Sequence, residues 1–239
     1  MDEIYMNEVV GSDSYLQHLM EVEQVKPIIT MVEDTNMIEY NIAQRTEEWK
    51  RLRLGVITGT RLKDVLKSDN TPVIYEMLAE IGSETIEENF VNSAMQRGID
   101  LEPVAKALYE SKTGEIIDEV GFCKHEFYEL LGLSPDGFTS SRTGALEIKC
   151  PSTKNHVKYI CDDKIPADYL PQVVMYFLIN AKLEWLDFVS YDDRYKPLPL
   201  WIKRVTREEL SSKIVEVEEK LQVFYTKFKK YSAKLNSVK

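Results

Sequence analysis

The sequence predicts an α/β fold, in which a central mixed sheet of about five strands is flanked by helices. Strand composition or alternation marks short segments at about residues 116–122, 130–133, 145–150, 185–191 and 200–205. Helical spacing of apolar side chains marks longer segments at 72–81, 91–112, 168–181 and 206–231. With 239 residues, of which 44% are hydrophobic, the chain can bury one core of ordinary size. We therefore expect one main domain with appendages.

Residues 1–40 are predicted to form an acidic extension in front of that domain. They hold nine of the 40 acidic side chains and one lysine, which leaves 31 acidic and 29 basic side chains in residues 41–239. The segment lacks a sustained helical or strand period, so a partly disordered tail is favoured over an arm that docks a partner or mimics DNA. Because the body is nearly neutral, any nucleic acid would bind to local basic patches.

Composition also predicts a cytoplasmic protein without a membrane partner. The first residues lack the basic and apolar regions of a secretion signal, and no later run is long enough to span a bilayer. The three cysteines, Cys123, Cys150 and Cys161, are too few and too scattered for a disulfide framework or a four-thiolate iron–sulfur cluster.

The segment 44–66 is predicted to hold two short helices around a phosphate pocket. The first helix begins at Thr46 or Glu47, and the second begins near Arg61, after a turn rich in threonine. The free N–H groups at the start of a helix favour an anion, and Arg53 lies nearby in the sequence. Ordinary helix capping beside a surface arginine is the alternative.

The helix predicted at 91–112 carries a candidate site residue. Gly98 and Glu102 are one turn apart, so that Gly98 can admit a close neighbour while Glu102 points into the cleft. A solvated helix charge is the alternative for Glu102. Thr113 and Gly114 end the helix. Its expected buried stripe consists of Met95, Leu101, Val104, Ala105, Leu108 and Tyr109.

The main candidate for a catalytic centre lies between Leu133 and Pro151. Pro135 and Gly137 predict a turn that places Asp136 at a bend between strands. In the strand 145–150, Leu146, Ile148 and Cys150 face one way, whereas Glu147 and Lys149 face the other. Two carboxylates suit Mg²⁺ or Mn²⁺, and the adjacent lysine can orient or help to deprotonate water. An exposed Glu and Lys on an edge strand would be the alternative.

Two segments after that strand add candidate site residues. Lys154, in a helix or loop that follows Pro151, could contact a phosphate. Tyr169 and Gln172 lie on the polar side of the apolar helix 168–181, where Gln172 could hydrogen-bond the scissile phosphate or the attacking water. His156 is interpreted equally well as a surface or a functional residue.

The chain is predicted to end in an amphipathic helix, 206–239, packed on the domain 41–205. Thr206 and Glu209 form a capping box in the sequence. Residues 220–239 hold six lysines and no acidic residue. A solvated end and a basic contact to duplex backbone or to a neighbouring subunit are equally favoured. The stripe that continues from the box consists of Leu210, Ile214, Val217, Leu221, Phe224, Phe228 and Tyr231.

These motifs together resemble a known family. Asp136 followed by Glu147-x-Lys149 is similar to the PD-(D/E)xK nuclease signature. Over about residues 45–205, the chain resembles the phage lambda exonuclease family, which includes the YqaJ-like viral recombinase nucleases. Four blocks of residues occur in the same order as in that family. These blocks are Glu48–Thr58, Arg97-Gly98 with Glu102, Ser134–Gly137 with Leu146–Pro151, and Tyr169 with Gln172.

The resemblance implies a Mg²⁺-dependent 5′-to-3′ exonuclease that acts on linear duplex DNA and leaves 3′ single strands for recombination. It implies one or two metal ions held by Glu102, Asp136, Glu147 and the Ile148 carbonyl, with Lys149 and Gln172 in catalysis. It also implies that Arg53 and Thr60 hold the 5′-phosphate, that the protein is a ring-shaped trimer, and that an annealing protein is its partner. The segment 67–72 is shorter than in the family, so no third phosphate ligand is identified.

Two other functions remain open on sequence grounds. A structure-selective or sequence-specific endonuclease could use the same centre. The chain could also bind DNA ends or inhibit a host function through its acidic N-terminal arm. The intact Asp136, Glu147 and Lys149 argue against a scaffold without activity.

Overall fold

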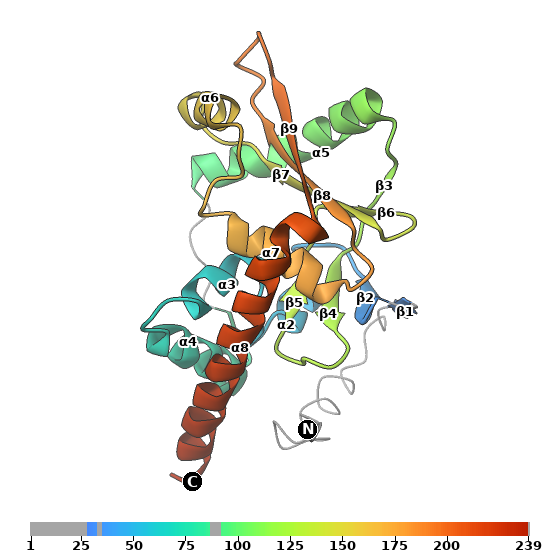
Figure 1. Cartoon of the computed structure of the whole chain (residues 1–239). Coiled ribbons are helices and arrows are strands. Elements are labelled where there is room, and N and C mark those ends of the chain that lie inside the picture. Colours follow the sequence, from blue (N-terminus) through green and yellow to red (C-terminus); the bar gives the residue numbers. More distant parts are fainter. Residues whose placement is uncertain (1–27, 33–34, 87–91, 239) are drawn as a thin grey trace.

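The computed structural model describes residues 28–32, 35–86 and 92–238, and its site-bearing part is a five-stranded mixed sheet (Figure 1). β7 and β8 are parallel, and the other neighbours in the sheet are antiparallel. This confirms the predicted fold class. In sheet order the strands are β3 (Ile117–Asp118), β6 (Gly137–Thr139), β7 (Gly144–Lys149), β8 (Trp185–Tyr191) and β9 (Leu200–Thr206).

Helices cover both faces of this sheet. α5 (Ser93–Thr113) contacts β7, β8 and β9 on one face, where Leu146 and Ile148 join its buried Ala105 and Tyr109 in one apolar cluster. On the other face, Ala145 belongs to the cluster that surrounds α7 (Leu170–Ile179). The alternation expected for residues 145–150 is therefore confirmed, and β7 turns its charged side chains toward α7.

A second, antiparallel sheet corrects two expectations. It contains β1 (Ile28–Val32), β2 (Met37–Asn41), β4 (Phe122–His125) and β5 (Gly132–Leu133). The predicted strand at 130–133 belongs to this sheet, and β6, for which no strand was predicted, takes a place in the larger one. The predicted boundary at residue 40 falls inside β2, so the last part of the expected extension is folded onto the domain. Residues 1–27, on which the docking-arm alternative rests, lie outside the described residues.

The smaller sheet is tied to the larger one by an arginine. Arg142, in the turn between β6 and β7, donates through Nε to Glu39 of β2 at 2.6 Å and through Nη1 to Asp118 of β3 at 2.7 Å. Arg142 and Glu39 are 103 positions apart in the sequence, so no local pattern could have revealed the pair.

The helix starts predicted from capping residues are confirmed. Thr46 caps α2 by accepting from the Trp49 N–H at 3.3 Å, and Gly114 ends α5 with φ +78°. Thr206 and Glu209 form both hydrogen bonds of the capping box of α8. The remaining helices are α2 (Glu47–Leu52), α3 (Gly59–Val65), α4 (Thr71–Ser83), α6 (Thr153–Asp162) and α8 (Arg207–Asn236).

α8 is the long helix that runs diagonally across the molecule to the C-terminus (Figure 1). Its buried stripe from Leu210 to Phe228 lies where the sequence predicts, against α7, α4 and β9. In the basic part, Lys227 donates at 2.8 Å both to Asn70 and to Thr71, at the start of α4. At least this lysine serves the packing of α8 rather than a solvated end.

The stripe expected on α5 is narrower than predicted. Only Ala105 and Tyr109 are buried, whereas Met95, Val104 and Leu108 are 49%, 48% and 37% exposed. The sheet strands β7, β8 and β9 are the main contacts of α5 within the described residues, and a single sheet covers one narrow strip of a helix. Gly98 likewise has no atom within 4 Å of where a Cβ would lie, so the expected close neighbour is absent among the described residues.

Gly121 permits a close approach that places residues 41–45 beside the site. A Cβ at Gly121 would lie 1.9 Å from the main-chain oxygen of Ile42, which cannot move without shifting that segment. We expect Gly121→Ala to lower the free energy of unfolding by about 1–3 kcal/mol, as overpacking does. Urea denaturation measures this.

Gly82→Ala is the matched control for that substitution. Gly82 lies inside α4, and no described atom lies within 4 Å of its added methyl group. Alanine should leave stability unchanged or raise it by about 0.5–1 kcal/mol, because it favours the helix. Equal urea midpoints for Gly121→Ala and the wild type would contradict the steric argument.

Candidate active site

The turn that carries Asp136 is fixed to the central strand. The main-chain N–H of Ile148 donates to Asp136 Oδ2 at 2.6 Å, so the carboxylate lies against β7. The Asp136 N–H in turn donates to the hydroxyl of Tyr176 on α7 at 3.0 Å. Gln44 Nε2 also donates to the Pro135 carbonyl at 3.0 Å, which holds the turn from the side of residues 41–45.

Glu147 and Lys149 form an ion pair on the face of β7 that α7 covers. Glu147 is fully buried, whereas the Lys149 side chain is 22% exposed. Glu147 Oε2 accepts from the Tyr176 hydroxyl at 2.7 Å, and Glu147 Oε1, beside the ammonium, accepts no hydrogen bond within the described residues. One oxygen of this carboxylate is therefore held by Tyr176, and the other is paired with Lys149.

The electrostatics of the three groups are coupled. Burial, and then the charge of Glu147, raise the pKa of Asp136 well above its usual range. Burial works against the charge of Lys149, but Glu147 and Asp136 outweigh it and raise the pKa of the ammonium. The lysine is thus a permanent cation, and the crowded carboxylates would be relieved by a second positive charge.

The donor set fits a divalent cation, although not with all the expected ligands. Asp136 and Glu147 Oε1, which has Lys149 as its ion-pair partner and no further hydrogen bond within the described residues, are hard oxygen donors of the kind that Mg²⁺ prefers. Within the described residues, however, no group of three or more His, Cys, Asp or Glu side chains comes together as a metal site. The structure therefore does not place Glu102 with Asp136 and Glu147 as the third carboxylate.

Glu102 instead pairs with a cation at the cavity. Arg45 Nη2 lies 3.5 Å from Glu102 Oε2, and both side chains are partly exposed. Burial raises the pKa of Glu102, while Arg45 and Lys149 oppose that shift and Glu147 reinforces it. The charges of Glu147 and Lys149 thus influence Glu102, but its ion-pair partner is Arg45.

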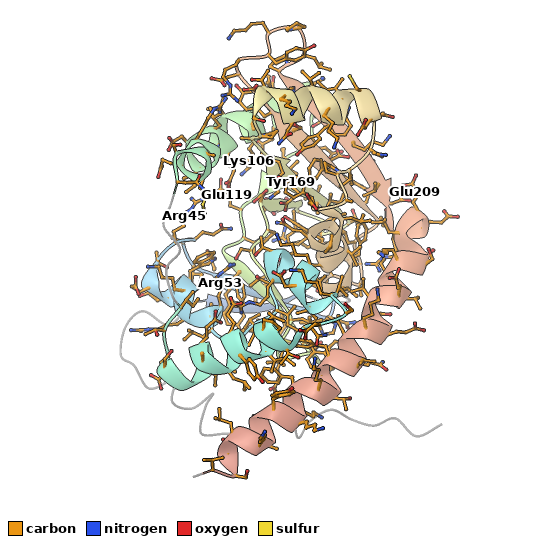
Figure 2. The ribbon with its side chains drawn as sticks, turned by 90° about the vertical axis from the view of Figure 1, so that its left-hand side faces the viewer. Arg45, Arg53, Lys106, Glu119, Tyr169 and Glu209 are labelled. Carbon is orange, nitrogen blue, oxygen red and sulfur yellow. The ribbon has the colours of Figure 1, made fainter. Side chains whose placement is uncertain are left out.

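A cavity of about 480 Å³ lies beside Arg45, Glu102 and Asp136. It is lined by Glu102, Asp136, Ile148 and the segment 41–45, together with Lys106 and Glu119, which pair at 2.9 Å. Figure 2 shows Arg45, Lys106 and Glu119 gathered between α5 and α2. Asp136 and Ile148 are therefore open to a ligand from this side.

Arg53 lies next to the turn of Asp136. Its Nη1 donates to Ser134 Oγ at 2.8 Å, and its guanidinium lies 4.1 Å from the centre of the Trp49 ring. Burial, and then the charge of Arg61, lower the pKa of Arg53 to about 10. Arg53 is thus charged at neutral pH, and within the described residues it has no carboxylate partner.

The other predicted DNA contacts are more scattered. Thr60 is exposed in the first turn of α3, where its hydroxyl lies 3.2 Å from that of Thr58 and makes no hydrogen bond with Arg53. Tyr169 lies at the catalytic pair, with its ring centre 5.3 Å from Lys149 Nζ. Lys154 is exposed in the first turn of α6 and makes no described contact with the centre.

Gln172 lies where α3 and α7 meet. A Cβ at Gly59 would lie 2.9 Å from Gln172 Cγ, so the glycine allows the two helices to approach. The side-chain amide of Gln172 makes no hydrogen bond within the described residues. The catalytic role of Gln172 stays a prediction.

Tyr176 is the site residue that sequence reasoning missed. It follows Gln172 by four residues on α7, so both lie on one face of that helix. That spacing was the available signal, but nothing else in the strongly apolar helix sets this tyrosine apart from its neighbours. His156, by contrast, is structural, since it is buried between Ser190 Oγ at 2.7 Å and the Leu198 carbonyl at 2.8 Å.

An aspartate, a glutamate and a lysine that meet beside the central strand of a mixed sheet define the protein as a nuclease of the PD-(D/E)xK class. Comparison with known proteins agrees. A model of the YqaJ-like viral recombinase domain matches residues 48–182. The chain belongs to the YqaJ-like viral recombinase family.

Solved structures extend the comparison. The alkaline exonuclease LHK-Exo from Laribacter hongkongensis is 35% identical, with a TM-score of 0.70, and the alignment covers 81% of this chain and 100% of that one. A structure of LHK-Exo in complex with dAMP gives a TM-score of 0.69 at the same identity and coverage. A phage-related exonuclease from Haemophilus somnus 129PT shares the fold, at 16% identity, a TM-score of 0.50, and 82% and 97% coverage of the two chains. No curated protein sequence matches.

The relatives at 35% identity are exonucleases, which supports an exonuclease role on DNA for this chain. Within the described residues, no helix is both long enough and apolar enough to cross a membrane.

Proposed function

We propose that the protein is a Mg²⁺-dependent exonuclease that digests the 5′-ended strand of linear duplex DNA and leaves a 3′ single strand for recombination. One observation carries this proposal: Arg53 contacts Ser134, two residues before Asp136. A cation without a carboxylate partner thus lies directly beside the catalytic turn. A terminal phosphate bound there would bring the next phosphodiester to the acidic centre.

Asp136, Glu147 and the Ile148 carbonyl would hold one or two Mg²⁺ ions, and Mn²⁺ could replace them. A bound ion would act as a Lewis acid on the phosphodiester. Glu102 would join as a further ligand once it is released from Arg45. The Lys149 ammonium would orient water, and Gln172 would hydrogen-bond the scissile phosphate.

The remaining contacts are assigned from the family resemblance. Thr60 would complete the phosphate pocket, Tyr169 would support Lys149, and Lys154 would contact the backbone from α6. The dAMP held by the relative LHK-Exo is a deoxynucleoside monophosphate, the kind of product that stepwise removal of nucleotides releases. The family resemblance supports a homotrimer, an annealing-protein partner and action in the host cytoplasm.

The first test compares linear with covalently closed circular duplex DNA in the presence of Mg²⁺. We expect the linear duplex to release mononucleotides and leave 3′ single strands while the circle survives, because the Arg53 pocket needs an end. Label placed in one strand at a time should show loss of the 5′-ended strand at each terminus. Gel and chromatographic sizing of the products measures both.

The same reaction with EDTA and with Glu147→Gln gives the background. Rapid cutting of the circle would instead support an endonuclease, and digestion from 3′ ends would contradict the proposed polarity. Binding of ends without cleavage would favour the end-binding alternative.

A further inference from the structure

The hydroxyl of Tyr176 joins the two segments that carry the catalytic carboxylates. It accepts from the Asp136 N–H at 3.0 Å, and it lies 2.7 Å from Glu147 Oε2 and 3.1 Å from the Leu146 carbonyl. Tyr176 is fully buried in α7. These contacts bridge positions 40 and 29 residues away in the sequence.

The single proton of this hydroxyl has one favoured acceptor. The Asp136 N–H already donates to the oxygen, so the O–H must point to Glu147 or to Leu146. The carboxylate is closer and charged, and a hydrogen bond to a charged acceptor is roughly twice as strong as a neutral one. Tyr176 therefore accepts from one catalytic segment and donates to the side chain of the other.

This arrangement divides the work of the two Glu147 oxygens. Oε2 is held by Tyr176, while Oε1 accepts no hydrogen bond within the described residues and faces the Lys149 ammonium. Because Oε2 is fixed, the carboxylate cannot rotate freely. Oε1 thereby keeps its place beside the Lys149 ammonium.

The ring itself is held in place. Phe138 of β6 meets the Tyr176 ring edge-on, with centroids 5.7 Å apart. Phe138 follows Asp136 by two residues, so the same strand that leaves the turn also clamps the tyrosine. A rigid donor of this length spans from α7 to both segments, which a shorter serine or threonine could not do.

We propose that Tyr176 is a positioning residue that sets the distance between Asp136 and Glu147 and so prepares the centre for a divalent cation. This inference rests on the proposed metal-dependent function and names a residue on which that function depends. Groups that orient metal ligands through hydrogen bonds typically change metal affinity or activity by about 10–100-fold when removed.

Tyr176→Phe is the direct test, because it removes one oxygen and keeps the ring against Phe138. Calorimetric titration of the DNA-free protein with Mn²⁺ should show affinity about 10–100-fold weaker than in the wild type. The turnover number should fall, while the dissociation constant for duplex DNA measured in Ca²⁺ stays the same. A loss of packing alone would not produce this separation.

Tyr225→Phe is the matched control. Tyr225 is also buried, but its hydroxyl has no hydrogen-bond partner within the described residues and it lies on α8. Its loss should leave Mn²⁺ affinity and turnover unchanged. Melting curves in EDTA verify that both variants are folded at the temperature of titration, and titration at a lower temperature serves if Tyr176→Phe melts early.

The outcomes separate the inference from the function beneath it. If the wild type and Glu147→Gln bind Mn²⁺ equally, the proposed metal site is wrong. If the wild type binds Mn²⁺ through Glu147 but Tyr176→Phe matches its affinity, the positioning role of Tyr176 is overturned. Equal losses in Tyr176→Phe and Tyr225→Phe would also overturn it.

Discussion

Asp136→Ala, Glu147→Ala and Lys149→Ala are each expected to slow digestion of linear duplex DNA by roughly 100- to 1,000-fold or more. Each change removes a metal ligand or the cation that stabilises developing charge, and single groups of this kind contribute factors of that order. Initial rates with saturating Mg²⁺ and 5′-phosphorylated duplex measure the loss. Near-normal turnover by a folded Lys149→Ala variant would refute the role of the lysine.

Stability has to be followed alongside these rates. Glu147 is fully buried and is paired with Lys149, so removing either partner leaves a charge without compensation. For fully buried pairs that loss is about 3–5 kcal/mol, and it is smaller here because Lys149 is 22% exposed. Melting curves then show whether the assay temperature lies below unfolding. Glu147→Gln and Lys149→Met keep the side-chain volume, so they disturb the packing of the fold less than alanine does.

Lys213→Ala is a suitable control for the loss of a lysine. Lys213 pairs with Glu216 on the partly exposed surface of α8, away from the centre. An exposed pair of this kind contributes about 0–1 kcal/mol to stability. The Lys213→Ala variant should digest linear duplex DNA at a rate within about twofold of the wild type.

The second large effect concerns the 5′ end. If Arg53 binds the terminal phosphate, a 5′-phosphorylated duplex should be digested about 10- to 150-fold faster than a 5′-hydroxyl duplex, since a hydrogen bond to a charged group contributes about 1.5–3 kcal/mol. Arg53→Ala should slow only the phosphorylated substrate and largely erase the difference. Initial rates on the two substrates, prepared from one oligonucleotide, provide the measurement.

Arg53→Lys sharpens that test. A lysine keeps the charge but not the planar fork that contacts Ser134, so only part of the preference should return. The 5′-hydroxyl duplex is the internal control, because it lacks the group that Arg53 is proposed to bind. If Arg53→Ala slows digestion of both substrates equally, Arg53 contacts the internal DNA backbone or has a structural role. If the wild type digests both substrates at the same rate, the phosphate pocket is incomplete.

The centre was predicted from sequence because its information is local. In the strand 145–150 alternation alone separates Glu147 and Lys149 from Leu146 and Ile148, and the structure puts the two sets on opposite faces. Capping residues fixed the starts of α2 and α8 for the same reason, since a cap acts within three residues. Turn chemistry likewise placed Asp136 at a bend next to the strand.

The remaining features depend on which distant segments meet, and no periodicity records that. Arg142 donates a hydrogen bond to Glu39, which is 103 positions away in the sequence, and this contact holds part of the expected extension against the domain. The exposure of Val104 on α5 reflects how little of a helix one sheet can cover.

By itself, the sequence determined the type of each long element and the face of each charged group on β7, because these follow from backbone geometry over a few residues. Only the tertiary structure decided that Glu102 pairs with Arg45, that Arg53 reaches Ser134 and that Tyr176 links both carboxylate segments. Each of these contacts joins residues far apart in the chain, and the packing of their helices and strands against one another is what brings them within hydrogen-bonding distance.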